Sequence, residues 1–188
     1  MRGVIVAASV LLATLTTACG QDNATAPSTG LSVLLTDTPY SDAKALFVTF
    51  STVSAHQTGR DFMPLSFAGG ASTRTCDLKK LVGAQDVLGT GALPAGHYTE
   101  LRVTVSSATI YFDNASSGPP CADTIASPLG RGAKVTIPSG EVKLNREFDV
   151  KASALTTITL DFDGDQSIHM TGEGRYMMDP VIGVLSVQ

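Results

Sequence analysis

The 188-residue chain contains no tryptophan, and aromatic residues make up only 6% of it. This scarcity disfavours a carbohydrate-binding platform, because such platforms use aromatic rings as their stacking surface. Charged residues reach 16%, below the share of about a quarter that is typical of globular domains. The net charge is −4 and no stripe of Lys and Arg is present, so we expect no nucleic-acid partner.

Several motifs of enzymes and metalloproteins are also missing. There is no G-x-S-x-G nucleophile elbow, no phosphate loop, no dinucleotide fingerprint and no C-x-x-C pair. The three histidines, His56, His97 and His169, show no mutual spacing that predicts a catalytic set. We therefore expect a protein that is not an enzyme.

The first 18 residues have the composition of an export signal. Arg2 supplies a positive charge, and residues 4–15 form an apolar run of the length that signal peptides use. The run is too short to anchor the chain across a bilayer, which takes about 20 residues. We expect residues 1–18 to be a signal peptide that is removed during export.

Cys19 is the expected site of lipid attachment. The small residues Thr16, Thr17 and Ala18 precede it, as in bacterial lipoprotein signals, although Leu15 sits one place earlier than usual. The thiol would take a diacylglycerol, and the freed amine would take a further acyl chain such as palmitate. Several acyl chains together give stable membrane anchoring. The alternative is an ordinary signal peptide followed by an incidental cysteine.

Residues 19–30 are expected to form a flexible tether between lipid and domain. The stretch from Gln21 to Gly30 is polar, rich in small residues and free of large apolar side chains. The residue after the cysteine is Gly20 rather than Asp, which indicates the outer membrane as the destination in a Gram-negative cell. The expected location is thus the cell envelope, with the lipid anchor on the outer membrane.

If Cys19 carries lipid, Cys76 and Cys121 remain as a pair. In an oxidising compartment such a pair is most simply a disulfide. The alternative is two free, buried thiols. A disulfide would close a loop of about 45 residues and stabilise the fold by on the order of 4 kcal/mol.

From residue 31 onward, short β-branched runs follow one another, separated by Gly, Pro and Asn. Leu101, Val103 and Val105 alternate with polar residues, as in a strand with one buried face. Similar patterns predict strands at residues 31–35, 46–53, 134–137, 141–150, 155–162, 174–178 and 181–187. Many short strands at this spacing predict a single all-β domain over residues 31–188, a Greek-key β-sandwich of the immunoglobulin or transthyretin type.

Three local features refine this expected sandwich. Residues 76–82 have helical apolar spacing and predict one short helix, followed by Val87 and Leu88. The apolar parity changes after Val105, which predicts a bulge at Ser106 and Ser107. Tyr98 follows a Pro-x-Gly turn, like the tyrosine corner of Greek-key sandwiches, although packing alone would also explain it.

Six segments recur in the order found in an uncharacterised prokaryotic family. They are LSVLLTDTP (31–39), CDLKKL (76–81), LPAGHYTELRV (93–103), IPSG (137–140), LDFDGDQSI (160–168) and GRYMMDPVI (174–182). In these the chain resembles the domain-of-unknown-function family DUF4382. The resemblance implies an exported, often lipid-anchored, all-β domain with no assigned activity. The insert at residues 114–128, which carries Cys121, departs from the family pattern.

The strongest candidate for chemistry is the acidic segment at Asp161, Asp163 and Asp165. Alternating oxygen ligands of this kind could hold a hard cation such as Ca²⁺. The spacing departs from an EF-hand, since Gly164 falls at the fourth position rather than the sixth. A structural interpretation is that Asp161 and Asp163 face outward from a strand and that Gly164 and Asp165 form the next turn. Asp37, two residues before Pro39, and Asp179, directly before Pro180, are expected in turns or caps, although either could join this cluster.

Two classes of function therefore follow from the sequence. The first is a membrane-anchored envelope lipoprotein that acts as a non-catalytic binding or structural module for an unidentified protein partner. A sheet edge could serve this purpose by strand addition. The second is a calcium- or small-ligand-binding lipoprotein that uses Asp161, Asp163 and Asp165.

Overall fold

The computed structural model describes residues 29–188. The signal peptide, Cys19 and most of the tether lie outside the described residues, so the lipoprotein predictions are not tested by the fold. None of the helices within residues 29–188 is both long enough and apolar enough to cross a membrane.

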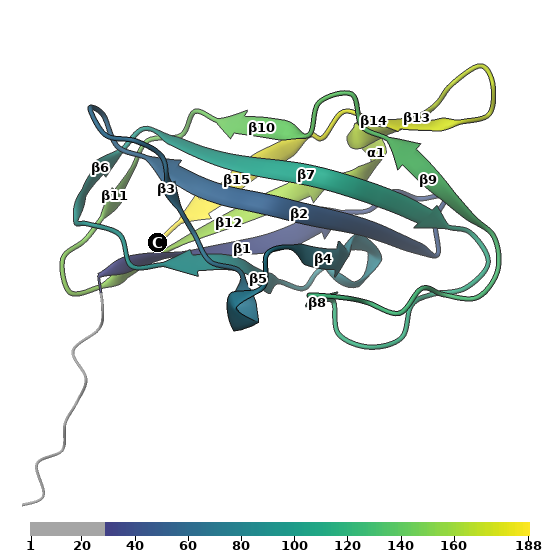
Figure 1. The fold of residues 1–188 in the computed structure, drawn as a ribbon, viewed down its shortest axis with the longest axis horizontal. Coiled ribbons are helices and arrows are strands. Elements are labelled where there is room, and N and C mark those ends of the chain that lie inside the picture. Colours follow the sequence, from purple (N-terminus) through teal and green to yellow (C-terminus); the bar gives the residue numbers. More distant parts are fainter. Residues whose placement is uncertain (1–28) are drawn as a thin grey trace, which may run out of the picture.

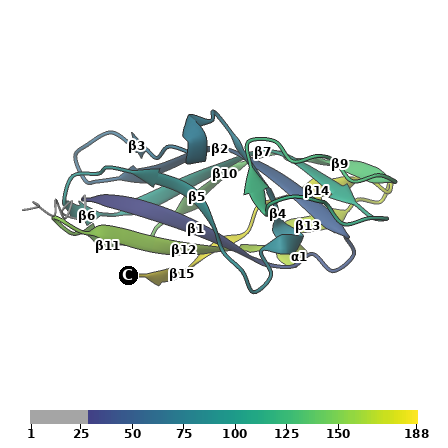
Figure 2. The same cartoon turned by 90° about the horizontal axis from the view of Figure 1, so that it is seen from below.

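The described chain folds as an all-β sandwich of two sheets, as predicted (Figures 1 and 2). The smaller sheet has four strands, in the order β15 (Ile182–Val187), β12 (Leu155–Asp163), β1 (Gly30–Thr38) and β5 (Asp86–Gly91). Strands β1 and β12 are parallel neighbours, and both are joined to antiparallel strands on their other sides.

The larger sheet has nine strands, and its long central pair is β2 with β7. Its order is β13 (Ile168–Met170), β14 (Tyr176–Met178), β9 (Gly132–Thr136), β7 (Glu100–Tyr111), β2 (Ala45–His56), β4 (Arg74–Asp77) and β8 (Cys121–Ala122), with β10 (Glu141–Leu144) beside β7 and β3 (Met63–Pro64) beside β2. A separate pair, β6 (Gly96–Tyr98) and β11 (Phe148–Val150), lies at one end. The long strands therefore form two layers, which Figure 2 shows edge-on.

The core lies between the two layers and is a single large cluster of buried apolar side chains. On β1 the residues Leu31, Val33 and Leu35 all point into it and are fully buried. Phe50 of β2 meets Phe162 of β12 edge to face, with ring centroids 6.4 Å apart. The two sheets are thus held together by the alternating inward residues that the sequence pattern predicts.

The predicted bulge and the predicted disulfide are both confirmed. Thr49 pairs with Ser107 and Phe50 with Val105, which leaves Ser106 as the extra residue. Cys76 and Cys121 lie opposite each other on β4 and β8 and form a disulfide. The bond ties the insert at residues 114–128 to the edge of the larger sheet.

The prediction for residues 76–82 is wrong in its details. Residues 74–77 form strand β4, a 3₁₀ helix follows at Leu78–Lys80, and Val87 and Leu88 belong to β5. The helical spacing of Leu78 and Leu81 arises because this single turn buries both side chains completely. The α-helix is instead α1 (Gly164–Ser167), where a turn was predicted, because the Asp163 carboxylate accepts a hydrogen bond from the Gln166 N–H and caps it.

Two strand boundaries also differ from expectation. The predicted strand at residues 141–150 is broken into β10 and β11. The strand predicted at residues 31–35 continues to Thr38, because Thr36 and Thr38 stay in register with Asp161 and Asp163 of β12. The glycine of the IPSG segment is required by close backbone packing, since a Cβ on Gly140 would lie 1.9 Å from the Val105 carbonyl oxygen.

Tyr98 forms the predicted tyrosine corner. Its side chain is fully buried, its ring stacks on Phe148, and its hydroxyl donates a 2.9 Å hydrogen bond to the Pro94 carbonyl oxygen. We expect Tyr98→Phe to lower the free energy of unfolding by about 1–2 kcal/mol, because it leaves that acceptor unpaired while keeping the ring. Urea denaturation of the two proteins measures this, and an unchanged midpoint would show that the ring alone matters.

Candidate functional site

Four carboxylates gather where the parallel strands β1 and β12 end. Because parallel strands finish at the same edge, Asp37 of β1 comes beside the end of β12, which carries Asp161 and Asp163. Helix α1 follows directly and adds Asp165. We call this region the acidic end: Asp37, Asp161, Asp163 and Asp165. In Figure 1 it lies at the right, around α1, opposite the start of β1.

The three carboxylates named as metal ligands each have a hydrogen-bond donor from the protein. Thr38 donates its hydroxyl to Asp161 at 3.0 Å, and the backbone N–H of Gln166 donates to Asp163 at 2.9 Å. Ser41 donates both its backbone N–H and its hydroxyl to Asp165. The acids therefore act as caps and cross-links between β1, the segment after it and α1.

Residues 29–188 contain no group of three or more His, Cys, Asp or Glu side chains arranged to hold a metal ion. Asp161, Asp163 and Asp165 are thus close in sequence but are not brought together as a triad. Binding Ca²⁺ there would require these carboxylates to converge, in competition with the hydrogen bonds from Thr38, Ser41 and Gln166. We therefore expect millimolar Ca²⁺ to leave the melting temperature unchanged in calorimetry, since a ligand bound to the folded state must raise it. A rise that Asp161→Asn abolishes would restore the calcium interpretation.

Asp37 differs from its three neighbours, and the prediction that it lies in a turn or cap is wrong. It continues the inward row of β1 after Leu35, and only 5% of its surface is exposed. Neither carboxylate oxygen has a hydrogen-bond partner in the structure. Burial is the main reason that the pKa of Asp37 is raised to about 8, and Asp161 raises it further through charge repulsion.

Asp77, which is not among the site residues predicted from the sequence, organises the neighbouring junction. It is 1% exposed and accepts hydrogen bonds from the backbone N–H groups of Leu46 and Lys79 and from the Ser116 hydroxyl. These bonds join β2, the 3₁₀ helix and the insert. A buried acid with three donors is a structural element, and its place within CDLKKL, directly after Cys76, was the available signal.

The histidines have three separate sets of partners. His97 approaches Asp149 at 2.9 Å, His169 approaches Asp179 at 3.3 Å, and His56 lies 3.1 Å from the Thr99 hydroxyl. The Asp179 side chain is thus an exposed partner of His169, and its backbone N–H donates to the Ser167 carbonyl at the end of α1.

A comparison with protein-family models matches residues 28–180 to a family described as a domain of unknown function, DUF4382. The chain belongs to this family. Neither the search of curated proteins nor the search of solved structures gave a match. The matched DUF4382 region includes all four residues of the acidic end and the disulfide. Membership therefore assigns residues 28–180 to a family without an assigned activity.

Proposed function

We propose that this DUF4382 protein is a non-catalytic binding module, attached to the bacterial envelope by lipid on Cys19, that meets a protein partner with its acidic end. The observation that carries the proposal is the direction of the first strand. β1 starts at Gly30, the last residue of the expected tether, and runs away from it to Asp37. A lipid anchor at Cys19 would therefore hold the start of β1 near the membrane and present the acidic end away from it.

The short distance along the chain supports this orientation. Thr29 is ten residues beyond Cys19, and such a segment spans at most about 35 Å when fully extended. The domain would therefore remain close to the lipid surface, and its far end would be the part most open to other envelope proteins. The outer membrane is the proposed location because Gly20, rather than Asp, follows Cys19.

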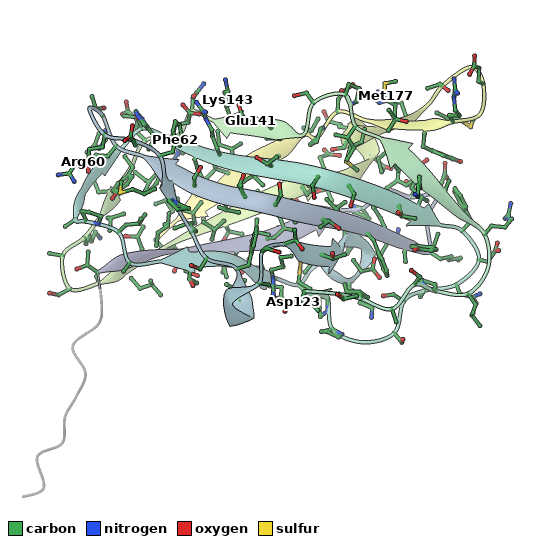
Figure 3. The ribbon with its side chains drawn as sticks, in the orientation of Figure 1. Arg60, Phe62, Asp123, Glu141, Lys143 and Met177 are labelled. Atoms are coloured by element: carbon green, nitrogen blue, oxygen red, sulfur yellow. A yellow bond between two sulfur atoms is a disulfide. The ribbon has the colours of Figure 1, made fainter. Side chains whose placement is uncertain are left out.

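The charges of the two ends fit the same orientation. On the larger sheet, toward the end opposite α1 (Figure 3), Arg102 is paired with Glu100 and Glu141 and covers the Phe62 ring at 3.9 Å. Figure 3 shows Arg60 and Phe62 at this end. At the acidic end, Asp161, Asp163 and Asp165 reach the surface, whereas Asp37 is buried and protonated at neutral pH. An anionic membrane surface would repel the acidic end, whereas a basic patch on a partner would complement it.

Attachment is tested by metabolic labelling with a palmitate analogue in cells that make the wild type or Cys19→Ser. The proposal expects label on the wild type alone, with Cys19→Ser released from the membrane fraction. Equal labelling of both proteins would contradict the anchor. Separating inner and outer membranes in the same cells tests the proposed location.

Partner binding is tested with a photo-crosslinking residue placed at Glu173 or, as a matched control, at Glu147. Both side chains are exposed, at 71% and 75%, and they lie at opposite ends of the sandwich. The proposal expects a discrete crosslinked protein from position 173 in intact cells and none from position 147, with high salt weakening the product. Crosslinks from position 147 alone, or from neither position, would contradict it.

A further inference from the structure

Asp37 occupies a position where an ionised carboxylate has nothing to stabilise it. It is the last inward residue of β1, it pairs in register with Phe162, and both of its oxygens are buried without a partner. A buried charge without a partner is strongly unfavourable, so such a group stays protonated instead. The raised pKa of Asp37, about 8, agrees with this geometry.

The charged groups that affect the ionisation of Asp37 come from three elements. Asp161 and Asp163 of β12 and Asp165 of α1 oppose its ionisation, and Lys79 of the 3₁₀ helix favours it. Lys79 does not pair with Asp37 in the structure. Its ammonium donates instead to the Tyr40 carbonyl oxygen, at 2.9 Å.

The segment that Lys79 holds forms a strap across the acidic end. We define the strap as residues 39–44, between β1 and β2. Ser41 is bonded to Asp165, and the Lys44 N–H donates to the Tyr111 carbonyl at 2.8 Å. Gly164 lies so close to the strap that a Cβ there would be 2.7 Å from the Tyr40 nitrogen. The strap is therefore fastened to α1, the 3₁₀ helix and β7 at once.

We propose that Asp37 is a proton-binding site that controls the strap through Lys79. When Asp37 loses its proton to solvent, the new carboxylate becomes the stronger acceptor, and the Lys79 ammonium moves to it from the Tyr40 carbonyl. The Tyr40 carbonyl then loses its donor and the strap loosens. The inference goes beyond the proposed binding role, because it concerns the fold of this end and needs no partner.

The test follows the side-chain carboxyl of Asp37 and the backbone amides of the strap by NMR across pH 4 to 10. The inference expects the Asp37 carboxyl signal to titrate with a midpoint near 8, and the Tyr40 and Ser41 amides to shift with the same midpoint. Asp37→Asn should remove that shared transition. Titration of Asp37 near the ordinary value of 3.8 would overturn the inference, as would strap amides that do not follow it.

Lys79→Gln tests the role of the ammonium, with Lys80→Gln as its matched control. Lys80 is the next residue, but it donates to the Gly118 carbonyl and not to the strap. Lys79→Gln should raise the pH at the midpoint of the Asp37 titration. The NMR signals of the strap amides of this variant at pH 6 should resemble those of the wild type at pH 9. Lys80→Gln should leave both unchanged. An unchanged midpoint in Lys79→Gln would overturn the exchange of partners.

Discussion

Asp37→Asn is expected to stabilise the protein at neutral pH, by on the order of 3 kcal/mol. Asn has nearly the shape of the protonated acid, so the packing against Phe162 should be retained. The gain arises because the wild-type unfolded chain releases a proton at neutral pH that the folded state keeps. The amide is itself buried without a partner, and this offsets part of the gain.

The pH dependence has a definite sign. The pKa of Asp37 is about 8 when folded, against 3.8 for a free aspartate. The stability that its carboxyl contributes is therefore fully present below pH 3.8 and falls as the pH rises toward 8, at up to about 1.4 kcal/mol per pH unit. Above pH 8 both states are ionised, and the loss is complete. Asp37→Asn should remove this slope.

Urea denaturation at one-unit steps from pH 4 to 9 measures both effects. Asp42→Asn is a matched control, because Asp42 lies in the strap, five residues after Asp37, and is exposed to solvent. An exposed substitution of this kind should change stability by no more than about 0.5 kcal/mol. If Asp37→Asn instead destabilised the protein at pH 7, Asp37 would have to be ionised and paired in solution.

The sequence predicts the fold well because most strands carry their own pattern. Leu101, Val103 and Val105 alternate, and the parity change after Val105 marks the bulge at Ser106 without any knowledge of the partner strand. Tyr98 is recognisable for the same reason, since its hydroxyl reaches back only four residues, to Pro94. These features depend on contacts that are local in the chain.

The acidic end is harder to predict because it depends on residues far apart in the chain. Asp37 precedes Thr38-Pro39, which is typical of a turn, yet pairing with β12 keeps it in the strand and buries it. That partner strand lies more than 100 residues away, so no local pattern contains the information. Helix α1 did leave a signal, because Asp163 followed three residues later by Gln166 resembles a capping box.

Removing the disulfide is expected to have the second large effect. In the double variant Cys76→Ala/Cys121→Ala the free energy of unfolding should fall by on the order of 4 kcal/mol, because the bond closes a long loop in the unfolded chain. The two cysteines are separated by 45 residues. The loss of stability should be largest for the insert, which is otherwise joined to β4 by the short strand β8 and by the hydrogen bonds of Asp77 with Ser116 and Pro120.

The insert has contacts of its own, and these limit how far it can detach. Ile125 packs with Ala45 and Phe47 in a small cluster on the outer face of the larger sheet, and the Ser116 hydroxyl donates to Asp77. We therefore expect the double variant to fold, with faster hydrogen exchange across β8 than in the central strand β7. Unfolding of the whole domain at 25 °C would show that these contacts are too weak to hold the insert.

The measurement needs Cys19→Ser in every protein, since a free thiol at that position could exchange with the disulfide. On that background, two differences in the free energy of unfolding are compared. The first is between the protein with Cys76 and Cys121 before and after reduction, and the second is between that oxidised protein and the double variant. The two differences should be about equal. Agreement between the two differences assigns the effect to the bond itself and not to the lost sulfur atoms. A difference below about 1 kcal/mol in both would mean that the unfolded chain is already compact around the insert, so that closing the loop removes little entropy.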